Sequence, residues 1–355
     1  MQREYDYAIL NSMDDWVRLL DKDGNVIFIN DAIKNNCENP EINRYMSEKS
    51  PYVAAINHEF VKKSTIVEEK FIAGKYYNVK ISPLFHENEH IGAIEVYRDI
   101  TNETKMKIDL FNANRKMIDD IRFARKIQKN ILPKNLNYDG LRLDSIYLPC
   151  DNLSGDMFDI IKIDENRYAF YIADVMGHGV TASIMTMFIK QTTKAILDKN
   201  NCIGPSEVLK RLKKKFFNMD NNTSQYFTIW IAIFDLKEDE MIFSNAGHNC
   251  IPLLKTKKEI KQLYLKGRMI SNVFDDDNFK QVTIKLNKED QILFYTDGVT
   301  ESINFEKEFF GIDRLKEIFL ESNTTKDILD ELKEFSWGEQ KDDIALAIIK
   351  YKETK

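Results

Sequence analysis

Short apolar runs alternate with polar turns over the first hundred residues. Runs at 17–20 and 26–29 flank the turn-forming segment Asp21-Lys22-Asp23-Gly24-Asn25, a pattern that predicts a β-hairpin. Two further strands are predicted at 75–81 and 90–97, joined by a polar connection at 87–89. The pattern therefore indicates an N-terminal domain built around antiparallel strands.

The pattern changes between residues 101 and 132, which contain neither Gly nor Pro. Apolar residues recur there every three or four positions, at Met106, Leu110, Ala113, Met117, Ile121, Ala124, Ile127 or Gln128, and Ile131. This spacing predicts a long helix, which Pro133 ends. Two interpretations are open: the helix packs on its own chain, or it pairs with a second copy as a dimerising signalling helix.

The remaining residues mix apolar strands with helices. Strands are predicted at 168–173, 227–234, 291–296 and 344–350, and helices at 180–198, 205–219 and 312–321. Antiparallel strands with a few helices are typical of an α+β sandwich with the helices outside. We therefore expect an N-terminal domain over 1–101, a linker helix over 102–133 and a C-terminal domain over 134–352.

Composition narrows the class of protein. The formal net charge of −6 argues against a nucleic-acid-binding protein. No stretch approaches the ~20 apolar residues of a membrane span, and the N-terminus lacks the apolar core of a signal peptide. The four cysteines, Cys37, Cys150, Cys202 and Cys250, lack the spacing of a zinc or redox motif and indicate reduced thiols. We expect a cytoplasmic protein that binds neither nucleic acid nor membrane.

Four aspartates of the C-terminal domain lie where predicted strands begin or end: Asp156, Asp174, Asp297 and Asp342. The end of one strand lies beside the start of its antiparallel neighbour, so Asp297 and Asp342 are expected to meet at one rim of a sheet. Alternation along the last strand places Asp342, rather than Asp343, on the same side as its bulkier apolar residues. We expect that side, and Asp342 with it, to face the core.

Carboxylates gathered at an apolar rim repel one another and resist desolvation, so protons or divalent cations must neutralise them. Oxygen ligands with few His or Cys nearby favour Mg²⁺ or Mn²⁺ over zinc. Any one of these aspartates could equally be a strand-end cap or a turn residue. The four together predict a metal site.

The same residues lie in five motifs that follow one another along the chain. They are Ser154-Gly155-Asp156, Asp174-Val175-Met176-Gly177-His178-Gly179, Asn245-Ala246-Gly247-His248-Asn249, Tyr295-Thr296-Asp297-Gly298-Val299-Thr300-Glu301 and Asp342-Asp343-Ile344. This series resembles the protein phosphatase 2C superfamily, in its bacterial SpoIIE/RsbU-type branch. The lead-in Ala124, Ile127, Gln128, Leu132 and Pro133 also resembles that branch, so the likeness covers about residues 120–350. It implies a metal-dependent serine/threonine protein phosphatase, which is a hydrolase, with a β-sandwich flanked by helices.

The resemblance also implies a role for each acid. Asp174 would bridge two Mn²⁺ or Mg²⁺ ions, and the backbone carbonyl of Val175 would add a ligand. Asp297 and Asp342 would supply the remaining metal-binding carboxylates, and Asp156 would bind metal directly or through water. Two such ions lower the pKa of a shared water and hold a phosphate for in-line attack.

His178 and His248 are the two histidines of the C-terminal domain. Either could protonate the leaving serine oxygen, or both could stabilise glycine-containing turns. In the eukaryotic branch the histidine that acts as general acid lies two residues after the bridging aspartate, where this chain has Met176. Ala345 stands where the bacterial branch commonly has Thr, which affects a ligand hydrogen bond but removes no metal-binding acid.

The N-terminal segment resembles a PAS domain. The resemblance rests on the hairpin ending in Phe28-Ile29-Asn30, a strand over 77–84, and the closing run from Ile94 to Thr101. PAS domains bind small ligands, haem or flavin, or simply dimerise; His58 is a candidate haem ligand or a structural histidine, and the ligand stays unknown. The two resemblances imply a phosphatase under PAS control that acts on a phosphorylated partner, such as a STAS-type anti-sigma-factor antagonist. The apolar spacing of the helix over 102–133 favours a homodimer.

Two other functions fit parts of the pattern. A catalytically silent PAS-regulated binding module would have the phosphatase fold without activity, but it would have no reason to keep four aspartates together. Another two-metal hydrolase, such as a phosphodiesterase, would usually draw on several histidines, and this domain has two. We expect a phosphatase in which the helix through Ala124 and Gln128 packs against the catalytic domain and sets its activity.

Overall fold

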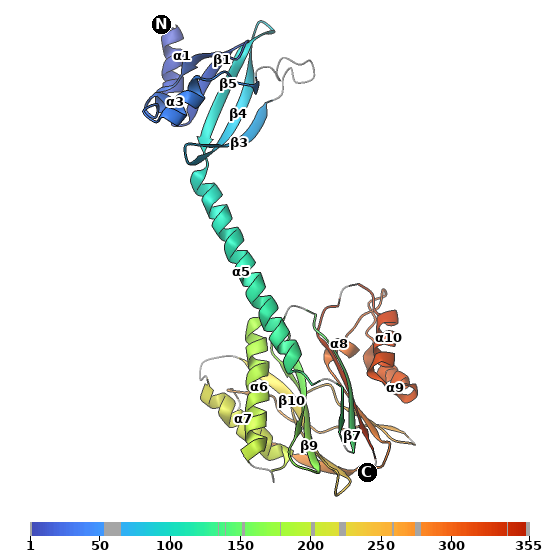
Figure 1. Ribbon diagram of the computed structural model, residues 1–355. Helices are drawn as coiled ribbons and strands as arrows, with labels where there is room; N and C mark the ends of the chain where they lie inside the picture. The colour runs from blue at the N-terminus through green and yellow to red at the C-terminus, as the bar shows by residue number, and fades with distance from the viewer. Residues whose placement is uncertain are drawn as a thin grey trace. The chain divides into compact units, whose positions relative to one another are not determined.

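The computed structural model describes residues 2–52, 65–133, 135–138, 140–150, 153–177, 179–199, 203–219, 225–257, 259–273, 278–338 and 340–352. The chain forms two compact units, Met1–Met117 and Ile118–Lys355 (Figure 1). None of the described helices combines the length and the apolar character needed to cross a membrane.

The smaller unit is built on an antiparallel sheet with the strand order β2-β1-β5-β4-β3. Its elements are α1 (Gln2–Asn11), β1 (Trp16–Asp21), β2 (Val26–Ile29), α2 (Asp31–Lys34), α3 (Pro40–Ser47), β3 (Ile66–Ile72), β4 (Lys75–His86) and β5 (Glu89–Asp99). The predicted hairpin is confirmed, since β1 pairs with β2, and the Asp21 carboxylate accepts hydrogen bonds from the backbone N–H groups of Asp23 and Asn25.

A buried ion pair joins the strands of this unit. Arg18 on β1 and Glu95 on β5 are 3% and 1% exposed, and Arg18 Nε donates to Glu95. The hydroxyls of Ser50 and Tyr97 also donate to the Glu95 carboxylate. Arg18 Nη1 donates to the carbonyls of Tyr45, Met46 and Glu48 at the end of α3. Every charge in the pair is therefore hydrogen-bonded, which is the condition under which buried ions are tolerated.

Helix α5 (Thr101–Ile131) confirms the predicted long helix and ends just before Pro133. Its apolar seam changes character along its length. Met106, Leu110 and Met117 are 71%, 63% and 57% exposed, whereas Gln128 is 5% exposed. The seam is thus uncovered in its first half and partly covered towards its end, where Gln128 is buried.

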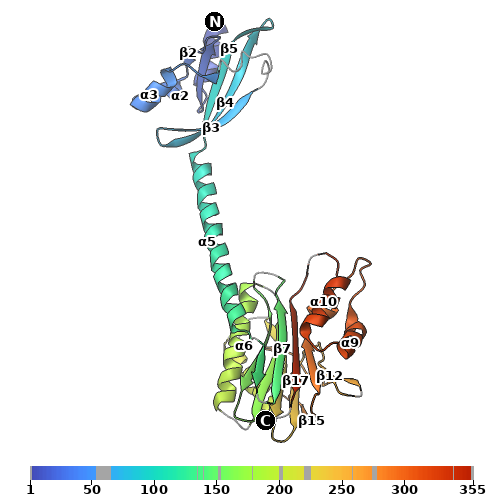
Figure 2. The same cartoon turned by 45° about the vertical axis from the view of Figure 1, so that its right-hand side comes forward.

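The larger unit holds two antiparallel sheets packed face to face (Figure 2). One has the order β15-β11-β10-β9-β8, with β14 pairing to β10, and the other has the order β13-β12-β16-β17-β7-β6. The strands are β6 (Leu136–Tyr138), β7 (Leu141–Leu148), β8 (Asp156–Lys162), β9 (Arg167–Val175), β10 (Tyr226–Asp235), β11 (Glu240–Ala246), β12 (Leu253–Lys255), β13 (Ile260–Gln262), β14 (Ile270–Ser271), β15 (Gln281–Lys285), β16 (Gln291–Tyr295) and β17 (Ile344–Tyr351).

Helices cover both outer faces of this sandwich. The first sheet packs against α6 (Val180–Lys199) and α7 (Pro205–Met219), and the second against α9 (Gly311–Glu321) and α10 (Thr325–Phe335). The short helix α8 (Asp297–Thr300) directly follows β16. Between the sheets, Phe170 and Phe294 bring their ring centroids to 4.2 Å. The expected sandwich with helices outside is confirmed for this unit.

Candidate active site

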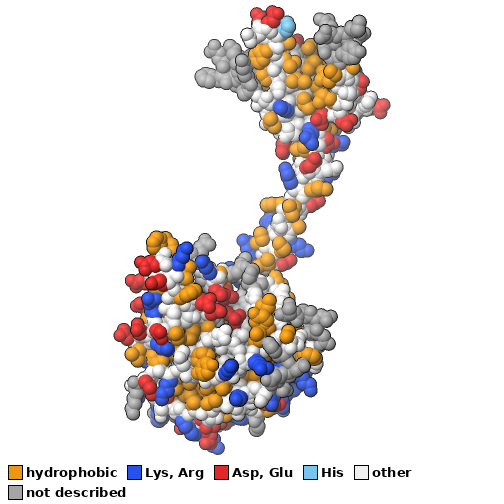
Figure 3. All heavy atoms as spheres, turned by 180° about the vertical axis from the view of Figure 1, so that it is seen from behind, with side chains coloured by type: hydrophobic (Ala, Val, Ile, Leu, Met, Phe, Trp, Pro, Cys, Tyr) orange, Lys and Arg blue, Asp and Glu red, His pale blue; other side chains and the backbone are white. Residues whose placement is uncertain are grey.

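The two sheets bring the four predicted aspartates to one rim of the sandwich. Asp156 opens β8 and pairs in register with Asp174 near the end of β9. Asp297 follows β16 and begins α8, while Asp342 lies two residues before β17, the strand that pairs with β16. Each sheet therefore contributes two of the carboxylates. Figure 3 shows acidic side chains gathered on one face of this unit.

The electrostatics show that these carboxylates lie close together. Burial raises the pKa of Asp156 well above its usual range, and the negative charges of Asp174, Asp343 and Asp297 raise it further. Burial, followed by repulsion from Asp297, Asp342 and Asp343, raises the pKa of Asp174 to about 7. Like charges shift a pKa in this way only over a short range.

The other two carboxylates belong to the same cluster. Burial raises the pKa of Asp297, and the neighbouring charges of Glu301 and Asp343 add to it. Partial desolvation raises the pKa of Asp342, which keeps some contact with solvent, and the charges of Asp297 and Asp343 contribute to that shift. The structure thus brings together all four aspartates that the sequence singles out.

The cluster fits hard divalent cations better than any partner that the chain itself offers. Asp156 Oδ2 is buried and accepts no hydrogen bond from a described residue. A buried carboxylate oxygen without a donor is costly unless a cation or a proton meets it. Within the described part of the chain, no three or more His, Cys, Asp or Glu side chains already form a group that could hold a metal ion. The carboxylates are therefore gathered but not closed around a common point, and the metal assignments stay predictions.

One expectation about orientation is wrong. Asp343 is 7% exposed and its carboxylate accepts a 2.8 Å hydrogen bond from the Cys150 N–H, whereas Asp342 is exposed. The reason is that β17 is buried on both faces. Its odd-numbered residues face the other sheet, and its bulkier even-numbered residues pack beneath α9 and α10. Side-chain size therefore did not identify the face that points into the sandwich.

Asp343 is a residue of the site that sequence reasoning passed over. Besides binding Cys150, it accepts a hydrogen bond at its carbonyl from Thr296 Oγ1, which in turn accepts one from the Ala345 N–H. These bonds hold the start of β17 against the residue that precedes Asp297. The adjacent acids Asp342 and Asp343 are the signal in the sequence that could have identified this role. One acid of such a pair can bind a ligand while hydrogen bonds hold the other in place.

Two motif glycines allow close backbone approaches within the cluster. A Cβ at Gly298 would lie 2.1 Å from the Asp343 carbonyl oxygen, and one at Gly155 would lie 2.7 Å from the Val175 carbonyl oxygen. Real Cβ atoms do not approach backbone oxygens so closely, so any side chain would push the segments apart. The glycines keep Asp297 near Asp342 and Asp156 near the predicted carbonyl ligand.

His248 is a buried residue of a turn. Its N–H donates to the Asn245 side chain, the Asn245 amide donates back to the His248 carbonyl, and its Nδ1 lies 3.2 Å from Thr228 Oγ1. Burial lowers the pKa of His248 to about 4. The imidazole is therefore neutral near pH 7, so the geometry favours the turn-stabilising role over that of a general acid. His178, the other candidate, lies outside the described residues.

Gln128 links α5 to the site. Its Nε2 donates to the Ser154 carbonyl at 2.7 Å, and its Oε1 accepts from the Ser154 N–H at 3.2 Å. Ser154 lies two residues before Asp156, and its Oγ accepts a hydrogen bond from the Asp156 N–H. The expected packing of this helix against the catalytic domain is thus confirmed at Gln128.

Comparison with known proteins identifies the family of the chain. The family model described as Stage II sporulation protein E (SpoIIE) matches residues 164–352. Phosphoserine phosphatase RsbP of Bacillus subtilis is 31% identical over 191 residues, which are 51% of this chain and 45% of that protein. Phosphoserine phosphatase RsbU of the same organism is 26% identical over 241 residues, 66% of this chain and 70% of that protein. The chain thus spans less than half the length of RsbP.

Solved structures show the same fold. The SiaA-PP2C domain of Pseudomonas aeruginosa superposes with a TM-score of 0.60 at 19% identity, covering 67% of this chain and 98% of that one. The PP2C phosphatase domain of SpoIIE from Bacillus subtilis, with a fragment of its regulatory domain, gives a TM-score of 0.52 at 14% identity and covers 84% and 73% of the two chains. The chain belongs to the SpoIIE family, and its larger unit has the protein phosphatase 2C fold.

Proposed function

We propose that this protein is a metal-dependent phosphatase that hydrolyses phosphoserine or phosphothreonine on a partner protein. The observation that carries the proposal is the cluster of four mutually repelling aspartates, two from each sheet, at one rim of the sandwich. The names of the relatives RsbP and RsbU, both phosphoserine phosphatases, support it. Release of phosphate from an aryl phosphate that requires Mn²⁺ and stops on chelation is the test.

The aspartates have distinct roles in this proposal. Asp174, Asp297, Asp342 and Asp156, with the Val175 carbonyl, would hold two Mn²⁺ or Mg²⁺ ions. When bound, such ions supply an acidified water and neutralise the phosphate. The residues of the chain orient that centre: Thr296 and Asp343 fix the start of β17, and the motif glycines bring the ligand-bearing segments together.

The smaller unit is proposed to be a PAS sensor over residues 1–101, followed by a signalling helix over 102–133 and the phosphatase domain over 134–352. Its antiparallel five-stranded sheet with short helices agrees with the architecture expected of a PAS domain. His58, the candidate haem ligand, lies outside the described residues. The proposed substrate is a phosphorylated regulatory protein, for which the family resemblance favours a STAS-type anti-sigma-factor antagonist.

The uncovered seam on α5 supports a homodimer. Met106, Leu110 and Met117 follow the spacing of a coiled coil and are more than half exposed. We expect Leu110→Glu combined with Met117→Glu to convert a dimer into a monomer, because facing charges would be buried in the seam. Sedimentation velocity measures the change, with Asn112→Glu, at an exposed position on the opposite face of the helix, as the control. A wild-type protein that sediments as a monomer would contradict the proposal.

Gln128 is expected to couple α5 to catalysis. Gln128→Ala removes both hydrogen bonds to the Ser154 backbone and should lower kcat several-fold, since Ser154 positions the segment that carries Asp156. Mn²⁺ binding, measured by calorimetry, should remain. Lys129→Ala, at the exposed neighbouring position, is the matched control. Wild-type turnover and regulation in Gln128→Ala would count against the coupling.

A further inference from the structure

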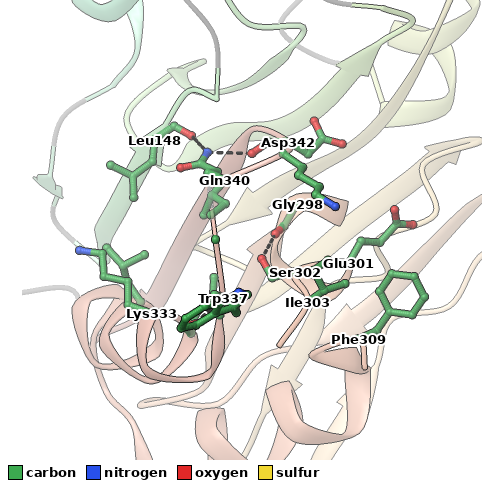
Figure 4. A pocket seen from close by; sticks show the side chains of 16 residues that line it. Leu148, Gly298, Glu301, Ser302, Ile303, Phe309, Lys333, Trp337, Gln340 and Asp342 are labelled. Carbon is green, nitrogen blue, oxygen red and sulfur yellow. Dashed lines mark hydrogen bonds between the residues drawn. The ribbon is translucent and has the colours of Figure 1, made fainter. Parts of the chain in front are cut away.

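A pocket of about 540 Å³ adjoins the aspartate cluster (Figure 4). Its walls come from α8, from α10 and from the segment that leads into β17, and they include the apolar side chains of Leu148, Ile303 and Leu332. It also shares Asp342, and the Gly298 that follows Asp297, with the candidate active site. Its volume lies within the usual range of ligand-binding pockets, about 300–1,000 Å³.

Exposed aromatic residues border this pocket. Trp337 and Phe309 are each 64% exposed. The ring of Trp337 packs edge-on against Phe305 at a centroid distance of 5.3 Å. The backbone N–H of Trp337 donates to the Ile303 carbonyl at 2.9 Å. The tryptophan is therefore held in place while most of its surface faces solvent. Fixed, exposed tryptophans are typical anchors of protein–protein contacts.

The pocket lining carries charges of both signs, from Lys333 and Lys341 and from Glu301 and Asp342. Neither lysine forms an ion pair with another described residue. In the view of Figure 4, Lys333 lies beside Trp337 on one side, and Asp342 and Glu301 lie towards the other. The pocket thus runs from Asp342 to an apolar end, where Lys333 supplies a positive charge beside Trp337.

We propose that this pocket binds a large apolar side chain of the phosphoprotein substrate, located a few residues from the phosphoserine, with an acidic neighbour that faces Lys333. The proposal rests on the proposed phosphatase function and adds a specificity site to it. A substrate whose phosphate lies at the aspartates passes Gly298 and Asp342 before it reaches the pocket. Because the pocket adjoins the aspartate cluster, it would select substrates by the residues that flank the phosphoserine.

The test uses a set of phosphoserine peptides built on Gly, Ser and Ala. Each peptide carries one Phe at a different distance from the phosphoserine, with an adjacent Asp, an adjacent Lys or neither, and the rates are normalised to p-nitrophenyl phosphate hydrolysis by the same variant. We expect one Phe position to raise kcat/KM about tenfold through a lower KM, the order expected for one well-buried aromatic contact. Trp337→Ala should abolish the preference for Phe, and Lys333→Glu should replace the preference for Asp by one for Lys.

A matched control is Tyr264→Ala, at a position that is 70% exposed and does not line the pocket; it should keep both preferences. Acrylamide quenching gives a second readout, because Trp16 and Trp230 are 7% and 0% exposed and Trp337 is the accessible tryptophan. The preferred peptide should protect this fluorescence. Equal rates at every Phe position, or preferences that survive both Trp337→Ala and Lys333→Glu, would overturn the proposed role of the pocket. Wild-type protein that fails to hydrolyse p-nitrophenyl phosphate would overturn the phosphatase function, and the pocket with it.

Discussion

Asp297→Asn is expected to lower Mn²⁺-dependent hydrolysis of p-nitrophenyl phosphate by at least about a hundredfold, the order seen when one group that stabilises a transition state is removed. The substitution keeps the shape of the side chain and removes the charge that would hold a cation. Phosphate release measured over a range of Mn²⁺ concentrations separates weaker metal binding from a slower reaction. Raising Mn²⁺ should restore part of the activity if binding alone is impaired.

The same variant has a second expected property. Because burial and neighbouring charges raise the pKa of Asp297, its charged form destabilises the folded protein at every pH above the ordinary carboxyl pKa. In EDTA, Asp297→Asn should therefore melt at the same temperature as the wild type or higher. Asp313→Asn, at an 89% exposed carboxylate on α9, is the matched control for activity. Activity that survives both Asp297→Asn and chelation would place the active site elsewhere.

Glu95→Ala is expected to destabilise the smaller unit by about 3–5 kcal/mol, the usual effect of leaving one member of a buried ion pair without its partner. Arg18 would keep its charge at 3% exposure, and the hydroxyls of Ser50 and Tyr97 would lose their acceptor. Hydrogen exchange followed by mass spectrometry in increasing urea measures the free energy of unfolding for this unit within the full chain.

Two further variants isolate the cause. Glu69→Ala removes an exposed carboxylate from β3, the edge strand of the same sheet, and should change stability by less than about 0.5 kcal/mol. Replacing both partners together, Arg18→Met with Glu95→Leu, should recover much of the loss because no unpaired charge remains. A loss below about 1 kcal/mol in Glu95→Ala would show that the pair is not a major determinant of the fold.

The long elements follow closely from the sequence because their periodicity extends over several turns or alternations. The helix predicted at 205–219 coincides with α7, and the strand predicted at 344–350 lies within β17. Strands β12, β13 and β14 have two or three residues, too few to show a period, and their pairing is set by neighbouring strands. No helix was predicted over α10, although Thr324 and Asp327 form a capping box at its start, which was a readable signal.

The sequence predicts the four aspartates of the candidate site, but it does not predict which of Asp342 and Asp343 points inward. The aspartates follow from strand ends and motif order, which the sequence displays directly. The inward position of Asp343 depends on the helices that cover the second face of β17, a contact between segments far apart in the chain. The neutrality of His248 likewise depends on burial by other segments. Sequence alone therefore identifies the chemical groups, and tertiary packing decides their protonation and direction.

The contact at position 298 limits how this protein can diverge. A single methyl group there would displace the carbonyl of Asp343, and with it the turn that carries Asp342. A variant with any other residue at this position would need compensating changes both in α8 and in the segment before β17. A single substitution of Gly298 is therefore expected to disrupt the site. The distance between the Asp297 and Asp342 carboxylates thus depends on Gly298, a residue that has no side chain of its own.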